Sequence, residues 1–255
     1  MAALYDRIGR SYALSREPDP RIAARVRRAL GDARTVLNVG AGAGAYEPPD
    51  LDVLAVEPSA VMIAQRPPGS APVLEACAER IPLPDDSVDA AMTILSDHHW
   101  TDRAAGLREL RRVARRRVVL LNADPAVVCA FWLSREYLPS FANLIPERWR
   151  HAGAWERELE EHLGPIVTEV VPVPRDCRDG FYAAYWRRPE AYLSPEIRDN
   201  ISVFRLLPEA DVRDAVDRLA ADLADGSWYE RHHELTTLDE LDVGMRIAVA
   251  QVTPS

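Results

Sequence analysis

Residues 35–47 read Thr35-Val36-Leu37-Asn38-Val39-Gly40-Ala41-Gly42-Ala43-Gly44-Ala45-Tyr46-Glu47. The first part is mostly apolar and partly β-branched, which predicts a buried parallel strand. It runs directly into three glycines at alternate positions, which predict a tight turn. Glycines permit positive φ angles and let a ligand approach the backbone, so the N–H groups of this turn can form a polar cradle. We therefore expect the chemistry of the chain to centre on this turn.

The composition of the 255-residue chain limits its class. The length fits one large α/β domain or a core with an elaborated cap, and either buries enough surface for a substantial core. Cys77, Cys129 and Cys177 show no CxxC pairing, which argues against disulfides or a zinc site and indicates a reducing, cytoplasmic setting. The sequence shows neither a signal-peptide pattern nor an apolar run of about 18 residues, so we expect neither secretion nor a membrane span.

The charge balance argues against a nucleic-acid partner. The formal net charge is −9, and every basic residue other than histidine is an arginine. Binding to phosphates needs a concentrated basic face, which this balance does not favour. The densest basic run, Arg111 to Arg117, follows a helical pattern, and we interpret it as a solvated helix C-terminus that complements the helix dipole. The sequence sets no expectation for the oligomeric state.

Strands and helices alternate through the first half of the chain. Asp19-Pro20 predicts the start of a helix that ends at Gly31, and further helices are expected to begin near Val61 and at Thr101. The expected strands are the one before the glycine turn, Leu51 to Val56, Val73 to Ala76, Val88 to Leu95 and Val118 to Leu121. This alternation is typical of βαβ units and predicts a parallel sheet with helices on both faces.

The second half has mainly helical patterns. Pro125 to Tyr137, Trp155 to Leu163 and most of residues 177–242 are expected to be helical. Ile166 to Pro174 predicts a strand, which belongs at a sheet edge because its prolines cannot donate to a ladder. Arg246 to Val252 predicts a final strand.

An acidic residue accompanies the glycine turn. Glu57 ends the second expected strand, beside the turn in a doubly wound sheet, where a carboxylate can accept both hydroxyls of a ribose. The same features suit a nicotinamide dinucleotide, because Gly40-x-Gly42-x-x-Ala45 also meets the loose dinucleotide fingerprint. These residues alone leave both cofactor classes open.

Further stretches resemble class I S-adenosylmethionine-dependent methyltransferases, in particular the small-molecule group that includes ubiquinone- and menaquinone-type enzymes. The resembling segments are Val36 to Gly44, Val53 to Ser59, Ala78 to Asp89, His98 to Trp100 and Leu107 to Val113. The resemblance implies a doubly wound, Rossmann-like α/β fold with a seven-stranded mixed sheet, mostly parallel with the last strand antiparallel, and a helical substrate cap. Two positions depart from the family pattern, where aspartate is usual: Asn38, which keeps an acceptor, and Cys77, which leaves adenine contacts to backbone groups and Glu79.

The resemblance also implies the cofactor S-adenosyl-L-methionine and the residues that hold it. The glycine turn would wrap the methionine and ribose, Glu57 would hold the ribose hydroxyls, and an N-terminal arm would close over the ligand. The implied cofactor residues are Tyr12, Arg16, Gly40, Ala41, Gly42, Gly44, Glu57, Ser59, Met62, Ala78, Glu79, Leu95 and Ser96.

Three regions are expected on this basis. Residues 1–33 would form an arm and helix over the cofactor, and residues 125–162 and 177–242 a helical cap on the acceptor side. The Rossmann-like core would comprise residues 34–124, 163–176 and 243–255. The candidate acceptor contacts in the aromatic-rich cap are Trp132, Tyr182 and Trp186, although aromatic residues at helical spacing are also typical of core packing.

His98 and His99 follow the fourth expected strand, near the ligand-binding end of the sheet. One of them is therefore a candidate general base, while a loop pair of histidines also serves capping or packing. The neighbouring Asp97 is expected to be a solvated or capping carboxylate.

The predicted function is methyl transfer to oxygen, nitrogen or carbon of a small organic acceptor that is neutral or cationic. The absence of lysine and the abundance of arginine, alanine and proline resemble residue usage in GC-rich bacteria, where such enzymes often tailor natural products. Three alternatives stay open: a methyltransferase-fold protein that catalyses cyclisation or another rearrangement, a nicotinamide-dependent oxidoreductase, and a ligand-binding protein without catalysis.

Overall fold

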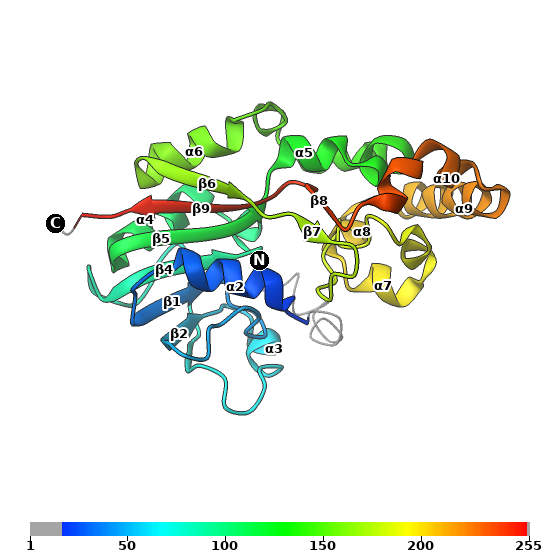
Figure 1. Ribbon diagram of the computed structural model, residues 1–255. Helices are drawn as coiled ribbons and strands as arrows, with labels where there is room; N and C mark the ends of the chain where they lie inside the picture. The colour runs from blue at the N-terminus through cyan, green and yellow to red at the C-terminus, as the bar shows by residue number, and fades with distance from the viewer. Residues whose placement is uncertain (1–16, 254–255) are drawn as a thin grey trace.

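The computed structural model describes residues 17–253, so the candidates Tyr12 and Arg16 lie outside the described residues. Seven strands form one sheet in the order β3-β2-β1-β4-β5-β9-β6 (Figure 1). These strands are β1 (Thr35–Val39), β2 (Asp52–Val56), β3 (Val73–Leu74), β4 (Val88–Ile94), β5 (Ala114–Ala123), β6 (Ile166–Val170) and β9 (Met245–Gln251). β1 to β5 are parallel, and β9 pairs antiparallel with both β5 and β6. The predicted mixed sheet with an antiparallel last strand is confirmed.

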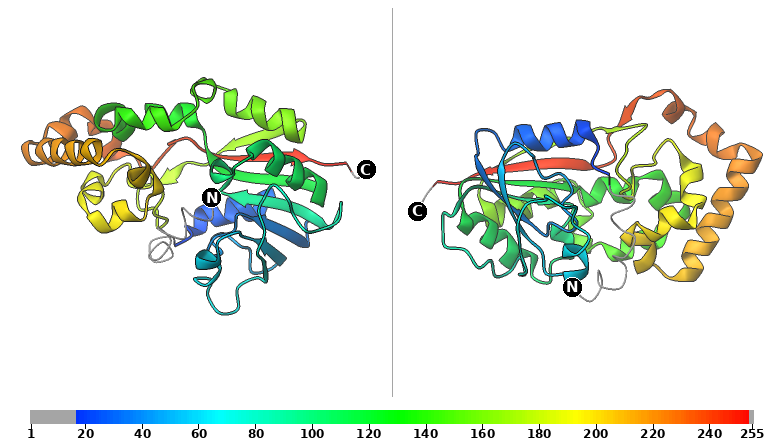
Figure 2. Two further views of the ribbon diagram at one scale, coloured as in Figure 1. Left: turned by 180° about the vertical axis from the view of Figure 1, so that it is seen from behind. Right: turned by 90° about the horizontal axis from the view of Figure 1, so that it is seen from below.

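Helices cover both faces of this sheet (Figure 2). α2 (Pro20–Ala29) packs on one face, where Val26 contacts the cluster that contains Val36. α4 (Arg103–Val113) and α6 (Ala154–Leu163) pack on the other, where Leu110 and Leu159 are fully buried with Leu37. Neighbouring residues of β1 therefore face opposite helical layers, as the alternation of side chains along a strand requires.

Side-chain caps set the helix starts. The Asp19 carboxylate accepts the Arg21 N–H at 2.9 Å, and Pro20 follows as the first helical residue of α2, as expected. The short α3 (Ala60–Ile63) is capped by Ser59, whose hydroxyl accepts the Met62 N–H. α4 is capped by Asp102, one residue after the expected Thr101.

The basic run from Arg111 to Arg117 crosses from a helix into a strand. Arg111 and Arg112 occupy the last turn of α4, but β5 begins at Ala114 and includes the other three arginines. Pairing with β4 and β9 holds this part of the chain extended. The expectation of a single helix C-terminus is therefore wrong for Arg115 to Arg117.

The second half forms two groups of elements. β6 is the edge strand of the main sheet, while β7 (Val173–Pro174) pairs with β8 (Glu240–Leu241) in a separate two-stranded sheet. The expected single strand from Ile166 to Pro174 is thus divided, because Pro172 has no N–H for the ladder after Val171 donates to the Met245 carbonyl at 2.9 Å.

The remaining helices lie beyond the carboxyl ends of the parallel strands (Figure 1). They are α5 (Pro125–Ala130), η3 (Leu133–Tyr137), η4 (Pro139–Leu144), η5 (Glu147–Trp149), η6 (Pro189–Leu193), α7 (Pro195–Asp199), α8 (Ser202–Leu206), α9 (Glu209–Asp225), α10 (Ser227–Arg231) and η7 (His233–Thr237). Residues 154–162, expected in the cap, instead belong to α6 on the sheet, because the stripe of Trp155, Leu159 and Leu163 is buried there. None of the helices within residues 17–253 is long and apolar enough to cross a membrane.

Candidate active site

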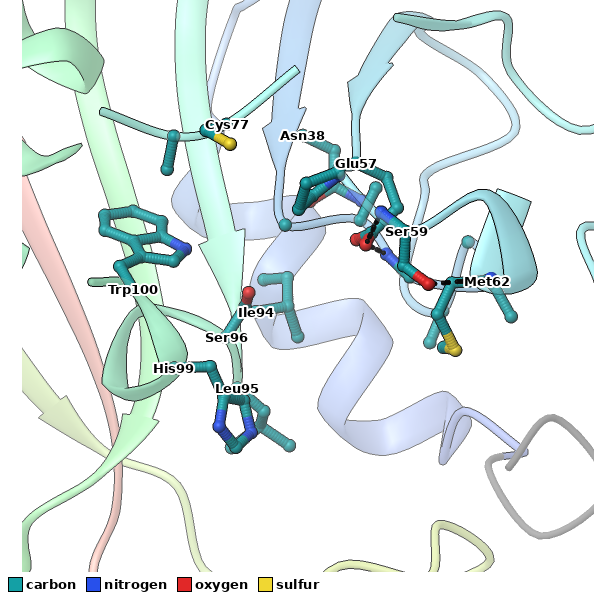
Figure 3. A pocket seen from close by; sticks show the side chains of 18 of the residues that line it. Asn38, Glu57, Ser59, Met62, Cys77, Ile94, Leu95, Ser96, His99 and Trp100 are labelled. Atoms are coloured by element: carbon teal, nitrogen blue, oxygen red, sulfur yellow. Dashed lines mark hydrogen bonds between the residues drawn. The ribbon is translucent and has the colours of Figure 1, made fainter. Parts of the chain in front are cut away.

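A cavity of about 270 Å³ opens at the carboxyl ends of β1, β2 and β4 (Figure 3). The described cofactor candidates all line it, although they are spread over four loops of the sequence, those after β1, β2, β3 and β4. They are Gly40, Ala41, Gly42, Gly44, Glu57, Ser59, Met62, Ala78, Glu79, Leu95 and Ser96. Strand ends that are adjacent in the sheet bring these loops together.

The glycine turn has the backbone geometry that its sequence predicts. Gly40, Gly42 and Gly44 have φ angles of 69°, 53° and 92°, which side-chain-bearing residues rarely adopt. A Cβ atom on Gly40 would lie 1.9 Å from the Ser96 hydroxyl, and one on Gly42 would lie 3.2 Å from the Met62 methyl group. The turn therefore forms a cradle that a Cβ atom would fill.

Glu57 is buried and ties two parts of the cavity wall together (Figure 3). One carboxylate oxygen accepts the Gly42 N–H at 2.8 Å, and the other accepts the Ser59 N–H at 2.9 Å. These bonds from backbone donors hold the glycine turn against the start of α3.

Two buried polar atoms in the cavity wall have no hydrogen-bond partner among the described residues. They are the acceptor Oδ1 of Asn38 and the donor Nε1 of Trp100. The Trp100 nitrogen would lie 3.3 Å from a Cβ atom on Gly40, so it faces the glycine turn. A buried acceptor and donor beside a glycine cradle fit a ligand with polar groups at several points, as a nucleoside joined to an amino acid has.

A buried ion pair braces the turn from outside. Arg66 Nη2 lies 2.8 Å from Glu47 Oε2, and the two side chains are only 5% and 9% exposed. Glu47 also accepts from Asn38 Nδ2 at 3.1 Å, and Arg66 donates to the Ala71 carbonyl. Nothing local in the sequence indicated this pair.

The loop after β3 forms another side of the cavity. Cys77 is exposed and lines it, and Glu79 accepts the N–H groups of Thr101 and Asp102 at 2.7 and 3.1 Å. Glu79 thus fastens this loop to the start of α4. The lining residues that the sequence did not assign to the cofactor include Pro18, Gln65, Pro67, Trp100 and Thr101; the last two directly follow the histidine pair, which was the available signal.

A second cavity of about 260 Å³ lies at the ends of β4 and β5, beneath the helices of residues 125–149 and 189–237, which we call the helical part. It shares Leu95 and His99 with the first cavity. Leu95 has a φ angle of 51°, an uncommon backbone conformation for a residue with a side chain. The aromatic residues that line the second cavity are Phe141, Trp149, Trp155, Phe181 and Tyr182. Its polar lining residues include His98, Arg103, Asn122, Asn200 and Ser202.

Of the three candidate acceptor contacts, one lines a cavity and two lie in the core. Tyr182 lines the second cavity, and burial raises the pKa of its phenol, whose oxygen lies 3.1 Å from Ser134 Oγ. Trp132 and Trp186 are buried elsewhere, and their indole N–H groups donate to the backbone carbonyls of Trp186 and Val173. They do not line either cavity, because their large apolar surfaces complete the core of the helical part.

A buried network of charges lies beneath the second cavity. Arg103 Nε donates to Asp97 Oδ2 at 2.8 Å, and another of its nitrogens pairs with Glu158. Asp97 is fully buried and bound by side chains, so the expectation of a solvated or capping carboxylate is wrong. The guanidinium needs both carboxylates as partners because burial would otherwise penalise its charge.

The two candidate bases are neighbours in η2 (Asp97–His99). Their ring centroids are 3.9 Å apart, and His98 Nδ1 lies 3.3 Å from Asn122 Nδ2. His99 lines both cavities, whereas His98 lines only the second. Within residues 17–253, no group of three or more histidine, cysteine, aspartate or glutamate side chains is placed to hold a metal ion.

Comparison with known proteins places the chain in a family. Residues 37–121 match the family model described as a methyltransferase domain. A solved structure from Anabaena variabilis, described as a candidate methyltransferase from an antibiotic biosynthesis pathway, is 32% identical, with a TM-score of 0.82 over 92% of this chain and 98% of that one. The chain belongs to the class I S-adenosylmethionine-dependent methyltransferases. Its cofactor is S-adenosylmethionine, which removes the nicotinamide alternative.

More distant structures share the fold of this methyltransferase. One is described as an S-adenosylmethionine-dependent methyltransferase from Thermotoga maritima and a candidate histamine N-methyltransferase; it is 15% identical, with a TM-score of 0.56, and the match covers 98% of this chain and 99% of that one. The YcgJ protein of Bacillus subtilis is 17% identical, with a TM-score of 0.53 and coverage of 92% and 99%. A search of curated proteins found no match.

Proposed function

We propose that this methyltransferase binds S-adenosylmethionine in the first cavity and methylates a small, neutral or cationic organic acceptor in the second. The observation that carries the proposal is the junction of the two cavities at Leu95 and His99. A transfer reaction needs its two reactants side by side with water excluded, and two cavities with a common wall supply that arrangement.

Different residues of the first cavity would bind different parts of the cofactor. Gly40 to Gly44 would approach the amino-acid and ribose parts through backbone N–H groups, and Glu57 would accept the ribose hydroxyls. The unpartnered atoms of Asn38 and Trp100 would receive polar groups of the ligand. When bound, S-adenosylmethionine supplies an activated methyl group, so these residues have only to hold and orient it.

The charges beneath the second cavity disfavour an anionic acceptor. Arg103 is the sole arginine that lines this cavity among the described residues, and it is already paired with Asp97 and Glu158. No unpaired cation is left there for a carboxylate or phosphate, and an anion would also be repelled by the extra carboxylate. The aromatic lining instead suits a flat, mostly apolar molecule.

Removal of a proton from such an acceptor would fall to the histidine pair. His99 lies at the cavity junction and His98 lines the second cavity, and imidazole is the side chain best suited to accept a proton near neutral pH. Tyr182 is unsuited to this role, because burial raises the pKa of its hydroxyl and keeps it protonated. Phenols, amines and activated carbon acids are therefore the acceptor classes to test, with tailoring of natural products as the expected context.

The experiment is turnover of methyl-labelled S-adenosylmethionine with a panel of matched aromatic acceptors. Each set contains one phenol, one amine, one carbon acid and the carboxylate of the same ring system, and products are identified by mass spectrometry. We expect label in the neutral and cationic members and none in the carboxylates. Label in the carboxylates would overturn the acceptor class. Acceptor conversion without label would support a rearrangement, and cofactor binding without any turnover would support a binding protein.

Tyr182 tests the place of the acceptor. Tyr182→Ala removes an aromatic wall of the second cavity but touches nothing in the first. We expect KM for the acceptor to rise about tenfold or more, while the affinity for S-adenosylhomocysteine stays within about twofold. Trp186→Phe, a change in the neighbouring core, is the matched control and leaves KM for the acceptor near that of the native chain. An unchanged KM in Tyr182→Ala would contradict binding in the second cavity.

A further inference from the structure

The side-chain amide of Asn122 has a fixed orientation. Asn122 is near the carboxyl end of β5, where its Oδ1 accepts the Ala123 N–H at 2.7 Å and its Nδ2 donates to Asp97 Oδ1. A backbone N–H can only donate and an ionised carboxylate can only accept, so the amide cannot be turned over. Asp97 is in turn paired with the Arg103 guanidinium at 2.7 Å, so its carboxylate oxygens face donors on both sides.

This orientation decides which nitrogen of His98 carries a proton. Asn122 Nδ2 has two hydrogens, one directed to Asp97 and the other available for His98 Nδ1 at 3.3 Å. Because a nitrogen that accepts a hydrogen bond must be unprotonated, the neutral ring of His98 has its proton on Nε2. The charged form would direct an N–H against the N–H of Asn122 and is disfavoured.

The state of His98 affects its neighbour. The two rings are 3.9 Å apart, so a charge on one would strongly oppose a charge on the other. When His98 stays neutral, no charge on its ring opposes the binding of a proton by His99. The charged groups packed beneath the pair are Asp97 of η2, Arg103 of α4 and Glu158 of α6.

We infer that Asn122 is a positioning residue that holds His98 neutral with its proton on Nε2, and so assigns proton removal from the acceptor to His99. The acceptor proton moves to a ring nitrogen of His99, and the electron pair stays on the acceptor atom that becomes methylated. His99 fits this role because it alone of the pair lines both cavities. The assignment of His99 rests on the proposed methyl transfer, whereas the state of His98 does not.

The first test is nitrogen NMR of the full chain labelled with ¹⁵N-histidine, which distinguishes the two neutral tautomers and the cation. The resonances are assigned with His98→Gln and His99→Gln. In the native chain we expect His98 to be neutral and protonated on Nε2. Asn122→Ala should give a mixture of tautomers, and Asn122→Asp should move the proton to Nδ1, because a carboxylate there can only accept.

Asn200→Ala is the matched control, since Asn200 lines the same cavity but donates to the Glu196 carbonyl and not to a histidine. It should leave the His98 resonances in place. A native His98 that is protonated on Nδ1, or charged at neutral pH, would overturn the inference without any variant. This NMR measurement needs no acceptor, so its result is independent of whether the proposed methyl transfer is found.

The second test is the pH dependence of kcat with an acceptor found in the panel above. His99→Gln should lower kcat by about 100-fold or more and flatten the rise of kcat with pH. His98→Gln should keep that rise, and Asn122→Ala should lower kcat by roughly tenfold while KM for the cofactor stays within about twofold. A flattened profile in His98→Gln with a normal profile in His99→Gln would overturn the assignment.

Discussion

At the scale of single residues, the first cavity depends on glycines whose backbone angles other residues rarely adopt. Gly40 combines a φ angle of 69° with a near neighbour, since an added Cβ would meet the Ser96 side chain. Gly69 shares the positive φ angle, 84°, but has open space around it, with nothing within 4 Å of an added Cβ. A comparison of variants at the two positions therefore distinguishes the effect of backbone strain from the effect of steric crowding.

Gly40→Ala and Gly69→Ala are therefore expected to differ. Both should lose roughly 1 kcal/mol of unfolding free energy to the strained φ angle. Gly40→Ala should also bind S-adenosylhomocysteine at least about tenfold more weakly, because Ser96 or the turn must move. Urea unfolding and titration calorimetry measure the two effects. Equal affinities in the two variants would contradict the role given to the turn.

At the same scale, the sequence could predict the lining of the first cavity better than that of the second. Glu57 and Ser96 were predictable because they follow strands, and all parallel strands present their carboxyl ends at one edge. Trp132 and Trp186 were not, because a buried aromatic ring has the same sequence pattern whether it faces a cavity or fills the core. The Asn122 contact with His98 was likewise invisible, since it joins two separate strand ends.

At the scale of elements, the ion pair of Arg66 and Glu47 holds the glycine turn in place. Both side chains are nearly buried, and Arg66 also contacts the carbonyl groups of Gly42 and Ala71. Removal of one partner would leave the other as an unpaired buried charge. That cost is larger than the net contribution of the intact pair.

A double-mutant cycle tests this brace. Arg66→Met should lower the unfolding free energy by roughly 3–5 kcal/mol, because it leaves the Glu47 carboxylate without its cation. Glu47→Gln combined with Arg66→Met should recover much of that loss, since the charge is then gone. Urea unfolding of the four proteins gives the coupling free energy. A coupling below about 0.5 kcal/mol would mean that the two residues act independently.

Element boundaries show where sequence patterns stop being sufficient. The division between α4 and β5 falls within an arginine-rich run whose composition does not change, and it is set by the pairing of Val88 with Ala114 in the sheet. The strand expected up to Pro174 ends at Val170, because Pro172 cannot donate to the ladder and the chain then pairs with β8. The first boundary is therefore set by tertiary pairing, and the second by a proline together with a new pairing partner.

At the scale of the whole molecule, Asp19 joins the sheet layer to the helical part. Its carboxylate caps α2 and also accepts the N–H of Arg178. The Asp19 N–H donates to the Tyr46 hydroxyl, which in turn donates to the Asp179 carboxylate. Burial alone would raise the pKa of Asp19, but hydrogen bonds from Arg21 and Arg178 outweigh it and lower the pKa to about 2. The ionised form is therefore the one that stabilises the fold.

The pH dependence of Asp19→Asn follows from that shift. Because the pKa falls from 3.8 in the unfolded chain to about 2 in the fold, the contribution of Asp19 is complete above about pH 4 and is lost as the pH falls toward 2. Asp19→Asn should cost about 2 kcal/mol of unfolding free energy at pH 7, with the difference from the native chain shrinking below pH 4. Urea unfolding across this range measures it.

Asp176→Asn is the control for this comparison, since Asp176 also pairs with Arg21 but is exposed. It should change stability little at any pH. If Asp19→Asn showed the same difference from the native chain at pH 7 and pH 3, the ionised carboxylate would not be the stabilising form.

In the proposed arrangement, the cofactor occupies the cavity of the glycine turn and faces the second cavity across Leu95 and His99. A crystal structure of the full chain with S-adenosylhomocysteine tests it most directly, because this product has the adenosine and amino-acid parts of the cofactor. We expect its density along Gly40 to Gly44, with the ribose at Glu57 and the sulfur toward the shared wall. Density in the second cavity, or away from the glycine turn, would contradict the account.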